Sequence, residues 1–227
     1  WTTLDEGIVD TYLDRVVALA DPAKTTGARL SVVYSAMHGV GGGLFESVCE
    51  RLGFVDLHAV AEQFEPDGSF PTVAFPNPEE PGAMDLALAT AHRERADLII
   101  ANDPDADRLA VGIPTGDGFR MLRGDEVGVL LGWWTSVRAP AQGSLVTTIV
   151  SSSMLASVAQ AAGLGFQQTL TGFKWITRPD DIVYGYEEAL GYCVDPAAVR
   201  DKDGISASAR MLELAAHLQV QGKTIAG

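Results

Sequence analysis

Short apolar runs alternate along this sequence with longer segments of helical periodicity, and this alternation limits the possible folds more than any other feature. Apolar residues that recur every three or four positions predict helices, whereas short apolar runs between turn residues predict strands. The expected strands are 30–35, 55–60, 97–101, 109–113, 145–150, 166–170 and 182–186, and the expected helices are 4–20, 44–52, 82–95, 124–137, 152–162 and 205–220. Alternation at this spacing is typical of βαβ units. The sequence therefore predicts an α/β fold class, with mainly parallel mixed sheets flanked by helices.

The pattern of strands and helices restarts near residue 119, just after a hairpin signal at Asp117-Gly118. A chain of 227 residues is long enough for two domains of roughly 100 residues each. We therefore expect two consecutive α/β domains, residues 1–118 and residues 119–227, with no low-complexity linker between them.

The charge balance of the chain excludes some classes of partner. Sixteen basic and thirty acidic residues give a formal net charge of −14, whereas general nucleic-acid binding needs a basic surface. No apolar run reaches membrane-spanning length, and the first residues do not form a signal peptide. The two cysteines, Cys49 and Cys193, make no disulfide framework. We expect a cytoplasmic globular protein that binds neither nucleic acid nor membrane, and the missing initiator Met leads us to expect a piece of a longer chain.

An acidic loop is the most informative stretch of the sequence. Asp103, Asp105 and Asp107 occupy alternate positions between two predicted strands, at an edge of the sheet where α/β proteins bind ligands. Three carboxylates in one tight loop repel each other, and a hard cation such as Mg²⁺ relieves that repulsion while keeping positions open for water or phosphate. Arg108 follows directly and offers a planar fork suited to phosphate. The loop therefore predicts a site for a metal ion and a phosphate.

The acidic loop has three other possible interpretations. An EF-hand would need Gly at its sixth position and Glu at its twelfth, where this chain has Arg108 and Pro114. A phosphatase nucleophile strand of the Asp-x-Asp-x-Thr/Val type fails too, because the fifth residue is Asp107 when counted from Asp103, and Leu109 when counted from Asp105. The third alternative is a solvated acidic turn without a ligand.

Other motifs allow both a structural and a chemical interpretation. The glycine-rich turn at 38–43 lacks the third glycine of a dinucleotide fingerprint and the Gly-Lys pair of a P-loop, so we expect it to be mainly structural. His38 could serve in either role. The serines at 151–153 precede a helical segment and are expected to cap it rather than to act as nucleophiles. Asp203-Gly204 is expected to be a turn that caps the last helix.

Charged residues also follow predicted strands in the second half. Lys174 could supply a point charge to a phosphate or sugar oxygen, although an ordinary exposed lysine would have the same sequence. Glu187 and Glu188 could accept hydrogen bonds from vicinal sugar hydroxyls, although they could equally be solvated charges at the edge of a sheet. These residues taken alone leave both interpretations open.

The segment Asp103-Pro-Asp-Ala-Asp-Arg-Leu-Ala-Val resembles the metal-binding loop of the α-D-phosphohexomutases, the phosphoglucomutase and phosphomannomutase family. Other segments that resemble this family are Ala36-Met-His-Gly-Val-Gly and Phe70-Pro-Thr-Val-Ala-Phe-Pro-Asn-Pro-Glu-Glu-Pro of its second domain, and Thr171-Gly-Phe-Lys-Trp-Ile, Gly185-Tyr-Glu-Glu-Ala-Leu-Gly-Tyr and Asp201-Lys-Asp-Gly-Ile-Ser-Ala of its third. The resemblance covers essentially the whole chain, and several motifs in the same order are far more specific than any one alone.

The resemblance implies a role for each matching residue. Metal binding is implied for Asp103, Asp105 and Asp107, catalysis for Arg108 and Lys174, and substrate binding for Thr171, Gly172, Glu187 and Glu188. Glu187 matches the Glu of the family's sugar-recognition loop, and Glu188 is the alternative in register. Ala189 stands where that loop has a Ser, and Leu190 is inserted before the following Gly, so the sequence does not indicate which sugar is preferred.

The resemblance also implies a reaction. In the family, a phosphoserine donates its phosphoryl group to a hexose phosphate, and the hexose 1,6-bisphosphate so formed returns its other phosphoryl group to the serine. The family's phosphoserine motif and its C-terminal phosphate-binding domain have no counterpart here, so we expect a central fragment that is inactive without its flanking domains. The alternative functions are a noncatalytic module that binds Mg²⁺ and sugar phosphate, and a phosphatase.

Overall fold

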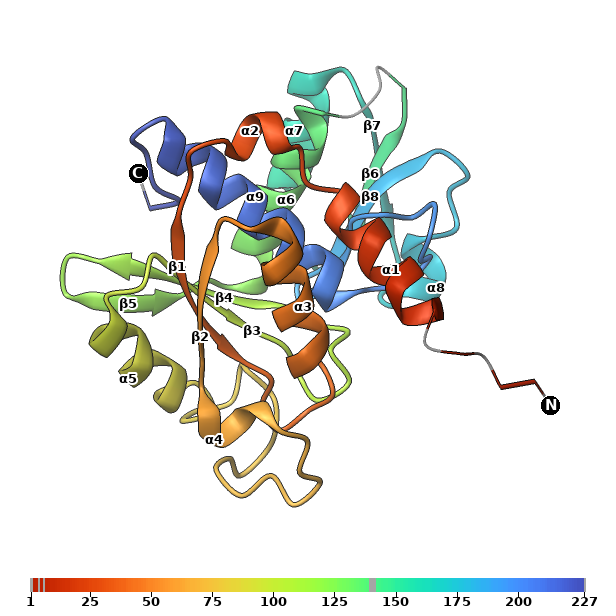
Figure 1. Ribbon diagram of the computed structural model, residues 1–227. Helices are drawn as coiled ribbons and strands as arrows, with labels where there is room; N and C mark the ends of the chain where they lie inside the picture. Colours follow the sequence, from red (N-terminus) through yellow and green to blue (C-terminus); the bar gives the residue numbers. More distant parts are fainter. Residues whose placement is uncertain (1, 4, 6, 139–141, 227) are drawn as a thin grey trace.

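The computed structural model of the protein describes residues 2–3, 5, 7–138 and 142–226, and the described chain forms two sheets flanked by helices (Figure 1). The strands are β1 (Leu30–Ser35), β2 (Val55–Ala59), β3 (Leu98–Ala101), β4 (Ala110–Thr115), β5 (Gly118–Met121), β6 (Ser144–Thr148), β7 (Gly165–Thr169), β8 (Ile182–Glu187) and β9 (Gly191–Cys193). The helices are α1 (Gly7–Ala18), α2 (Pro22–Thr25), α3 (Gly42–Leu52), α4 (Ala61–Phe64), α5 (Asp85–Glu94), α6 (Gly124–Ser136), α7 (Met154–Ala162), α8 (Phe173–Ile176) and α9 (Gly204–Val220). The predicted α/β fold class is confirmed.

The expected first helix, 4–20, corresponds to α1, and Leu4 lies outside the described residues. The hairpin expected at Asp117-Gly118 is confirmed, since β4 and β5 pair antiparallel across it. None of the helices in the described part of the chain has the length and apolar character needed to cross a membrane.

In each sheet, parallel strands come first along the chain, and a tight loop then reverses its direction. The sheet orders are β2-β1-β3-β4-β5 and β7-β6-β8-β9. β1 pairs in parallel with β2 and β3, and β6 pairs in parallel with β7 and β8. β3 and β4 are antiparallel across residues 102–109, and β8 and β9 are antiparallel across residues 188–190. Such short loops can join only antiparallel neighbours, because a parallel return needs a crossover of a dozen or more residues. The two candidate functional loops thus occupy equivalent positions in the two sheets.

One predicted strand, 145–150, ends earlier than its apolar run. The chain turns after Thr148, whose carbonyl accepts a hydrogen bond from the amide of Ser151 at 3.3 Å. Ile149 and Val150 are 59% and 60% exposed at this turn. The prediction of a strand to residue 150 is therefore wrong at its end, because these two apolar side chains lie outside the core that a strand would bury.

Helix α9 lies between the two halves of the molecule and is buried along most of its length (Figure 1). It packs against α1, α2 and α3 of the first half and against α6 and β9 of the second. Asp203 caps it as predicted, since its carboxylate accepts hydrogen bonds from the amides of Ile205 at 3.1 Å and Ser206 at 3.3 Å. The hydroxyl of Tyr12 donates to the same carboxylate at 2.9 Å. This contact joins α1 to the first turn of α9.

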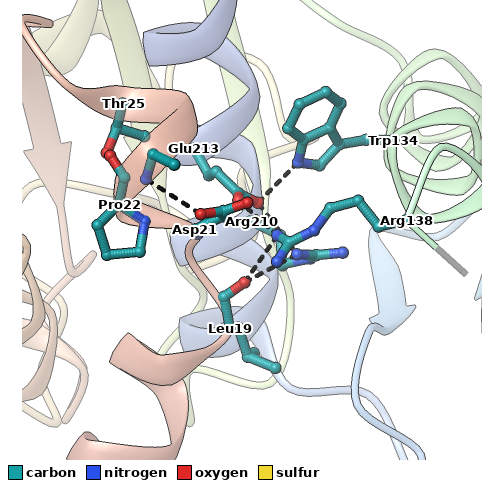
Figure 2. Close-up of polar contacts among 9 residues, drawn as sticks. Leu19, Asp21, Pro22, Thr25, Trp134, Arg138, Arg210 and Glu213 are labelled. Atoms are coloured by element: carbon teal, nitrogen blue, oxygen red, sulfur yellow. Dashed lines mark hydrogen bonds and ion pairs between the residues drawn. The ribbon is translucent and has the colours of Figure 1, made fainter.

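Glu213, on α9, is fully buried and collects hydrogen bonds from three parts of the chain (Figure 2). The donors are Trp134 Nε1 at 2.7 Å, Arg210 Nη1 at 3.0 Å, the amide of Asp21 at 2.7 Å and Arg138 Nη1. Arg138 and Arg210 each also donate to the carbonyl of Leu19 at 2.9 Å. A carboxylate can be removed from water only when its charge and lone pairs are matched in this way. The Glu213 network therefore fixes α6, α9 and the α1–α2 connection relative to one another.

We expect Glu213→Gln to lower the free energy of unfolding by about 3 kcal/mol, because it leaves two arginines without their carboxylate. Glu94→Gln is the matched control. Glu94 pairs with Arg93 at the surface, with side chains 31% and 67% exposed, and loss of an exposed pair costs about 0–1 kcal/mol. Urea denaturation followed by circular dichroism measures both changes. Equal stability of Glu213→Gln and the parent protein would contradict the role assigned to the network.

Candidate active site

The acidic loop, residues 102–109, leaves the carboxyl end of β3 and returns as β4. Within it, carboxylate oxygens of Asp103, Asp105 and Asp107 lie within 4.8 Å of one another. Asp103 is buried, Asp107 is half-buried and Asp105 is exposed. Oxygen ligands at this spacing suit a hard divalent cation. The fold thus brings together the three residues for which the sequence predicts metal binding.

The side chain of Asn102 supports the loop from the inside. Its Oδ1 accepts a hydrogen bond from the Tyr34 hydroxyl at 3.0 Å, and its Nδ2 donates to the carbonyl of Arg108 at 2.6 Å. The amide of Ala106 donates to the carbonyl of Asp103 at 2.9 Å, and Ala106 has a φ of 59°, in the left-handed region. This conformation costs an alanine of order 1 kcal/mol. The hydrogen bonds across the loop offset that cost and hold its shape.

Two glycines allow neighbouring backbone to approach the acidic loop closely. A Cβ atom on Gly39 would lie 2.3 Å from the Cα of Pro104, and one on Gly204 would lie 2.3 Å from the carbonyl oxygen of Arg108. The amide of Gly204 donates to the carbonyl of Ala106 at 3.0 Å. The glycine-rich turn and the start of α9 therefore hold the loop from two sides, which agrees with the mainly structural role expected for that turn.

His38 is 4% exposed and takes part in a local hydrogen-bond network. Its Nε2 lies 2.8 Å from the Thr72 hydroxyl, which also accepts a hydrogen bond from Gln63 Nε2 at 2.9 Å. The backbone amide of His38 donates to the carbonyl of Gln63 at 2.8 Å. Of the two roles left open for His38, these contacts support the structural one, since they tie the glycine-rich turn to the proline-rich segment that follows.

Arg108 binds the buried aspartate of the loop through two donors. Its backbone amide donates to Asp103 Oδ1 at 3.0 Å, and its Nε donates to Asp103 Oδ2 at 2.7 Å. Burial raises the pKa of the Asp103 carboxyl above its ordinary value, the hydrogen bonds and charge of Arg108 oppose that effect, and the charge of Asp105 adds to it. A cation bound at the loop would act in the same direction as Arg108 and favour the ionised carboxylate.

The second loop presents Glu187 at the end of β8 and Glu188 just after it. Glu188 Oε2 accepts hydrogen bonds from the hydroxyls of Ser151 at 2.6 Å and Thr148 at 3.2 Å. The expectation that all three serines cap α7 is therefore wrong for Ser151. The capping position is held by Ser153, whose side chain makes no capping hydrogen bond. The hydroxyl of Ser151 instead orients an acid that lies far away in the sequence.

Glu187 is half-buried beside cationic and backbone groups. Burial raises the pKa of its carboxyl above the ordinary value, whereas the charge of Lys202 and the backbone amide of Gly172 act in the opposite direction. Gly172 stands at the start of α8 with a φ of 100°, a conformation that favours glycine. Two residues predicted for the site, Gly172 and Glu187, therefore lie close enough for the backbone of one to act on the charge of the other.

Thr171 and Lys174 are exposed on either side of Gly172. Lys174 Nζ lies 5.9 Å from the centre of the Trp175 ring, and Lys174 makes no ion pair with any residue that the structure describes. Its ammonium group thus remains available to a ligand. Arg178 lies over the same ring at 4.3 Å, so two cations of similar exposure flank one aromatic side chain.

The two candidate loops meet edge to edge. The amide of Leu109 donates to the carbonyl of Leu190 at 3.1 Å, and Arg108 forms an antiparallel bridge with Gly191. The acids of the first sheet and those of the second are thereby brought to one place. A ligand carrying both phosphate and hydroxyl groups could contact both loops.

Sequence reasoning missed two charged residues near the candidate site, Lys202 and Glu79. Lys202 Nζ lies 2.5 Å from Asp107 Oδ2 and 6.0 Å from the centre of the Phe173 ring. Its segment resembles the family's, but no role was assigned to the lysine itself. A lysine between two aspartates just before a helix cap was the available signal. Glu79 lines a pocket together with Leu190 of the second loop. Burial raises the pKa of its carboxyl, and the charge of Arg108 lowers it.

Comparisons with known proteins agree with this arrangement. Residues 10–116 match the family model described as phosphoglucomutase/phosphomannomutase, α/β/α domain II, and residues 123–226 match the model for domain III. A probable phosphomannomutase of Haemophilus influenzae is 46% identical over all of this chain and 46% of its own length. A human phosphopentomutase is 38% identical over 87% of this chain and 35% of its own length. The chain therefore spans half or less of the length of these curated relatives.

A solved structure has the same fold. The crystal structure of a putative phosphomannomutase from Thermus thermophilus superposes with a TM-score of 0.83 at 27% identity, covering all of this chain and 50% of that one. The resemblance of the motifs to this family is thus confirmed.

We expect Gly39→Ala to destabilise the protein by about 1–3 kcal/mol, because the added methyl group collides with the backbone of Pro104. Gly43→Ala is the control in the same turn. A Cβ atom there meets nothing within 4 Å, and the position is helical, so this change should stabilise the protein by about 0.5–1 kcal/mol. Thermal unfolding measures both changes. A Gly39→Ala variant as stable as Gly43→Ala would contradict the close approach.

Proposed function

Since the chain belongs to the phosphoglucomutase/phosphomannomutase family, we propose that it forms the metal-binding and sugar-binding parts of a sugar-phosphate mutase. The proposed reaction moves a phosphoryl group between C1 and C6 of a hexose phosphate, through a phosphoserine and a hexose 1,6-bisphosphate. The observation that carries the proposal is the edge contact at Leu109 and Leu190, because it joins three aspartates and two glutamates in one site.

In this proposal, Asp103, Asp105 and Asp107 hold Mg²⁺. The donor set fits that ion, since each residue offers a hard carboxylate oxygen and the three oxygens lie close enough to share one cation. A bound Mg²⁺ would neutralise negative charge on the phosphoryl group during transfer. The buried position of Asp103 and the fixed loop shape keep these ligands in place without the ion.

Arg108 would orient the phosphoryl group. Its Nε is committed to Asp103, whereas its two terminal nitrogens make no hydrogen bond within the described part of the chain. Those nitrogens form the planar end of the guanidinium, which matches the geometry of two phosphate oxygens. The ion pair with Asp103 would therefore orient the guanidinium group of Arg108 and leave its terminal nitrogens available to a phosphate.

Glu187 and Glu188 would bind sugar hydroxyls, with Lys174, Thr171 and Gly172 beside them. One oxygen of Glu188, Oε2, already accepts two hydroxyl hydrogen bonds, so Oε1 faces fewer partners and could accept from a sugar. Lys174 would supply a positive charge to a phosphate or ring oxygen. This arrangement would let either end of the sugar face the acidic loop.

The remaining parts of the reaction would come from other regions of a longer protein. We propose that the serine that carries the phosphoryl group, and the site for the distal phosphate, lie on domains flanking this segment. We also propose that the segment consists of a metal-binding domain, residues 1–118, and a sugar-binding domain, residues 119–227. The two sheets support a division into two domains, and β5 (Gly118–Met121), the last strand of the first sheet, moves the boundary a few residues past residue 118.

The proposed function is tested with the product of the whole reading frame that contains these residues. We expect that protein to convert glucose 1-phosphate or mannose 1-phosphate to the 6-phosphate in the presence of Mg²⁺, in a coupled assay. Arg108→Met should lower kcat by roughly 100-fold or more, because a donor to the developing charge is lost. No conversion of either sugar phosphate by the whole protein would overturn the assignment to hexose phosphates. Robust conversion by the 227-residue chain alone would overturn the need for flanking domains.

The affinity for a sugar phosphate distinguishes the roles of two neighbouring cationic side chains, Lys174 and Arg178. We expect Lys174→Met to weaken binding of glucose 1,6-bisphosphate to this chain by about tenfold, since one charge-assisted contact is lost. Arg178→Met is the matched control, because Arg178 lies over the same Trp175 ring but outside the proposed set of ligand contacts. Isothermal titration calorimetry measures both affinities. The same loss for both variants would show a nonspecific effect of charge and would remove Lys174 from the site.

A further inference from the structure

Lys202 is carried to the acidic loop by the start of α9. Asp203 caps that helix, and the amide of Gly204 donates to the carbonyl of Ala106 at 3.0 Å. The backbone next to Lys202 is therefore bonded to the acidic loop. From this position the ammonium group reaches Asp107 Oδ2 at 2.5 Å, with Asp201 at 3.8 Å.

Two side-chain cations face the three carboxylates of the loop, and they are held differently. Arg108 binds both oxygens of Asp103, one through its backbone amide and one through its side chain. Both the backbone and the guanidinium group of Arg108 are therefore held at the loop. Lys202 binds Asp107 through a single side-chain contact and is 25% exposed. Asp105 makes no ion pair with any other described residue. Of the two cations, Lys202 is thus the one that can leave without breaking the loop.

Lys202 occupies the place where a metal ion would need Asp107. A hard divalent cation and an ammonium group compete for one carboxylate oxygen, because each approaches along its lone pairs. They also repel each other as like charges at short range. Asp107 cannot therefore keep its contact with Lys202 and serve fully as a metal ligand.

A second acid lies ready to receive the displaced ammonium group. Glu187 and Phe173 lie against the same glycine, since a Cβ atom on Gly191 would lie 3.0 Å from Glu187 Cγ and 2.8 Å from Phe173 Cε2. In agreement with this position, the charges of Lys202 and Glu187 each shift the pKa of the other toward its charged form. The same lysine lies 6.0 Å from the Phe173 ring, on α8 beside the second loop. A flexible four-carbon side chain can move between these neighbours while its backbone stays fixed.

We propose that Lys202 is an exchangeable counter-ion of the metal site: its ammonium group neutralises Asp107 in the metal-free protein and moves toward Glu187 when a divalent cation binds. This inference rests on the metal site of the proposed function. Lys202 is then a positioning residue, which links occupancy of the acidic loop to the charge beside the sugar-binding loop. Metal binding would add one positive charge to the second loop without any change of fold.

The first test is the affinity for Mg²⁺ alone, measured by calorimetry on this chain. We expect Lys202→Met to bind Mg²⁺ about tenfold more tightly than the parent, because the competing charge is gone. Lys223→Met removes a charge from an exposed lysine after the far end of α9, and it should change the affinity less than about twofold. Lys202→Arg keeps the charge and should not tighten binding. Unchanged or weaker binding by Lys202→Met would overturn the proposal.

The second test follows the ammonium group itself in the unsubstituted protein. The chain has four lysines, Lys24, Lys174, Lys202 and Lys223, so ¹⁵N–¹H spectra of lysine side chains are simple to assign with single Lys→Arg variants. We expect Mg²⁺ to shift the Lys202 signal and to leave Lys24 and Lys223 unchanged. A Lys202 signal that does not move while Mg²⁺ binds would overturn the exchange.

The variant Asp105→Asn tests the metal site independently of the exchange of Lys202. If Mg²⁺ binds to the parent and to Asp105→Asn equally, the metal is bound elsewhere, and both the proposed site and the exchange fail. If Asp105→Asn loses binding but Lys202→Met equals the parent, the metal site stands and only the exchange fails. Loss of binding by Asp105→Asn together with tighter binding by Lys202→Met supports both.

Discussion

The buried carboxylate of Glu213 is the constraint on which the arrangement of this molecule depends (Figure 2). An ionised group with no access to water must find its partners within the protein. Those partners come from the α1–α2 connection, from the end of α6 and from α9 itself. Because α9 also begins against the acidic loop, the same helix that satisfies this charge sets where that loop stands relative to the second sheet.

The site itself follows from a topology that occurs twice. Each sheet runs its parallel strands to one edge and then reverses through a tight acidic loop, and the two loops pair at Leu109 and Leu190. Glycines at 39 and 204 remove the side chains that would keep other backbone away from the first loop. Negative charge is thereby concentrated in one place, and Arg108 and Lys202 offset part of it. This concentration of negative charge favours the binding of cations.

Local sequence patterns predicted most of the fold and part of the site. The strand–loop–strand pattern predicted that Asp103, Asp105 and Asp107 lie together, because these carboxylates belong to one short segment whose geometry is local. The contacts of Lys202 and Ser151 could not be predicted, since each depends on a partner brought close only by the folded chain. The exposed run at Ile149 shows the opposite failure. An apolar run predicts that its side chains are buried, but Ile149 and Val150 are exposed in the folded chain. The run alone does not show where the strand ends.

The position of α9 has a consequence for how the chain reaches this structure during synthesis. The helix leaves the ribosome well after α1, α2 and α3, yet it covers all three. Contacts such as Tyr12 with Asp203 therefore wait until the intervening segment, which includes the whole second sheet, has been made. Until then the first sheet keeps part of its helical layer uncovered, although N-terminal units usually fold first. The helical layer of the first sheet is therefore complete only after the second half of this segment has been synthesised.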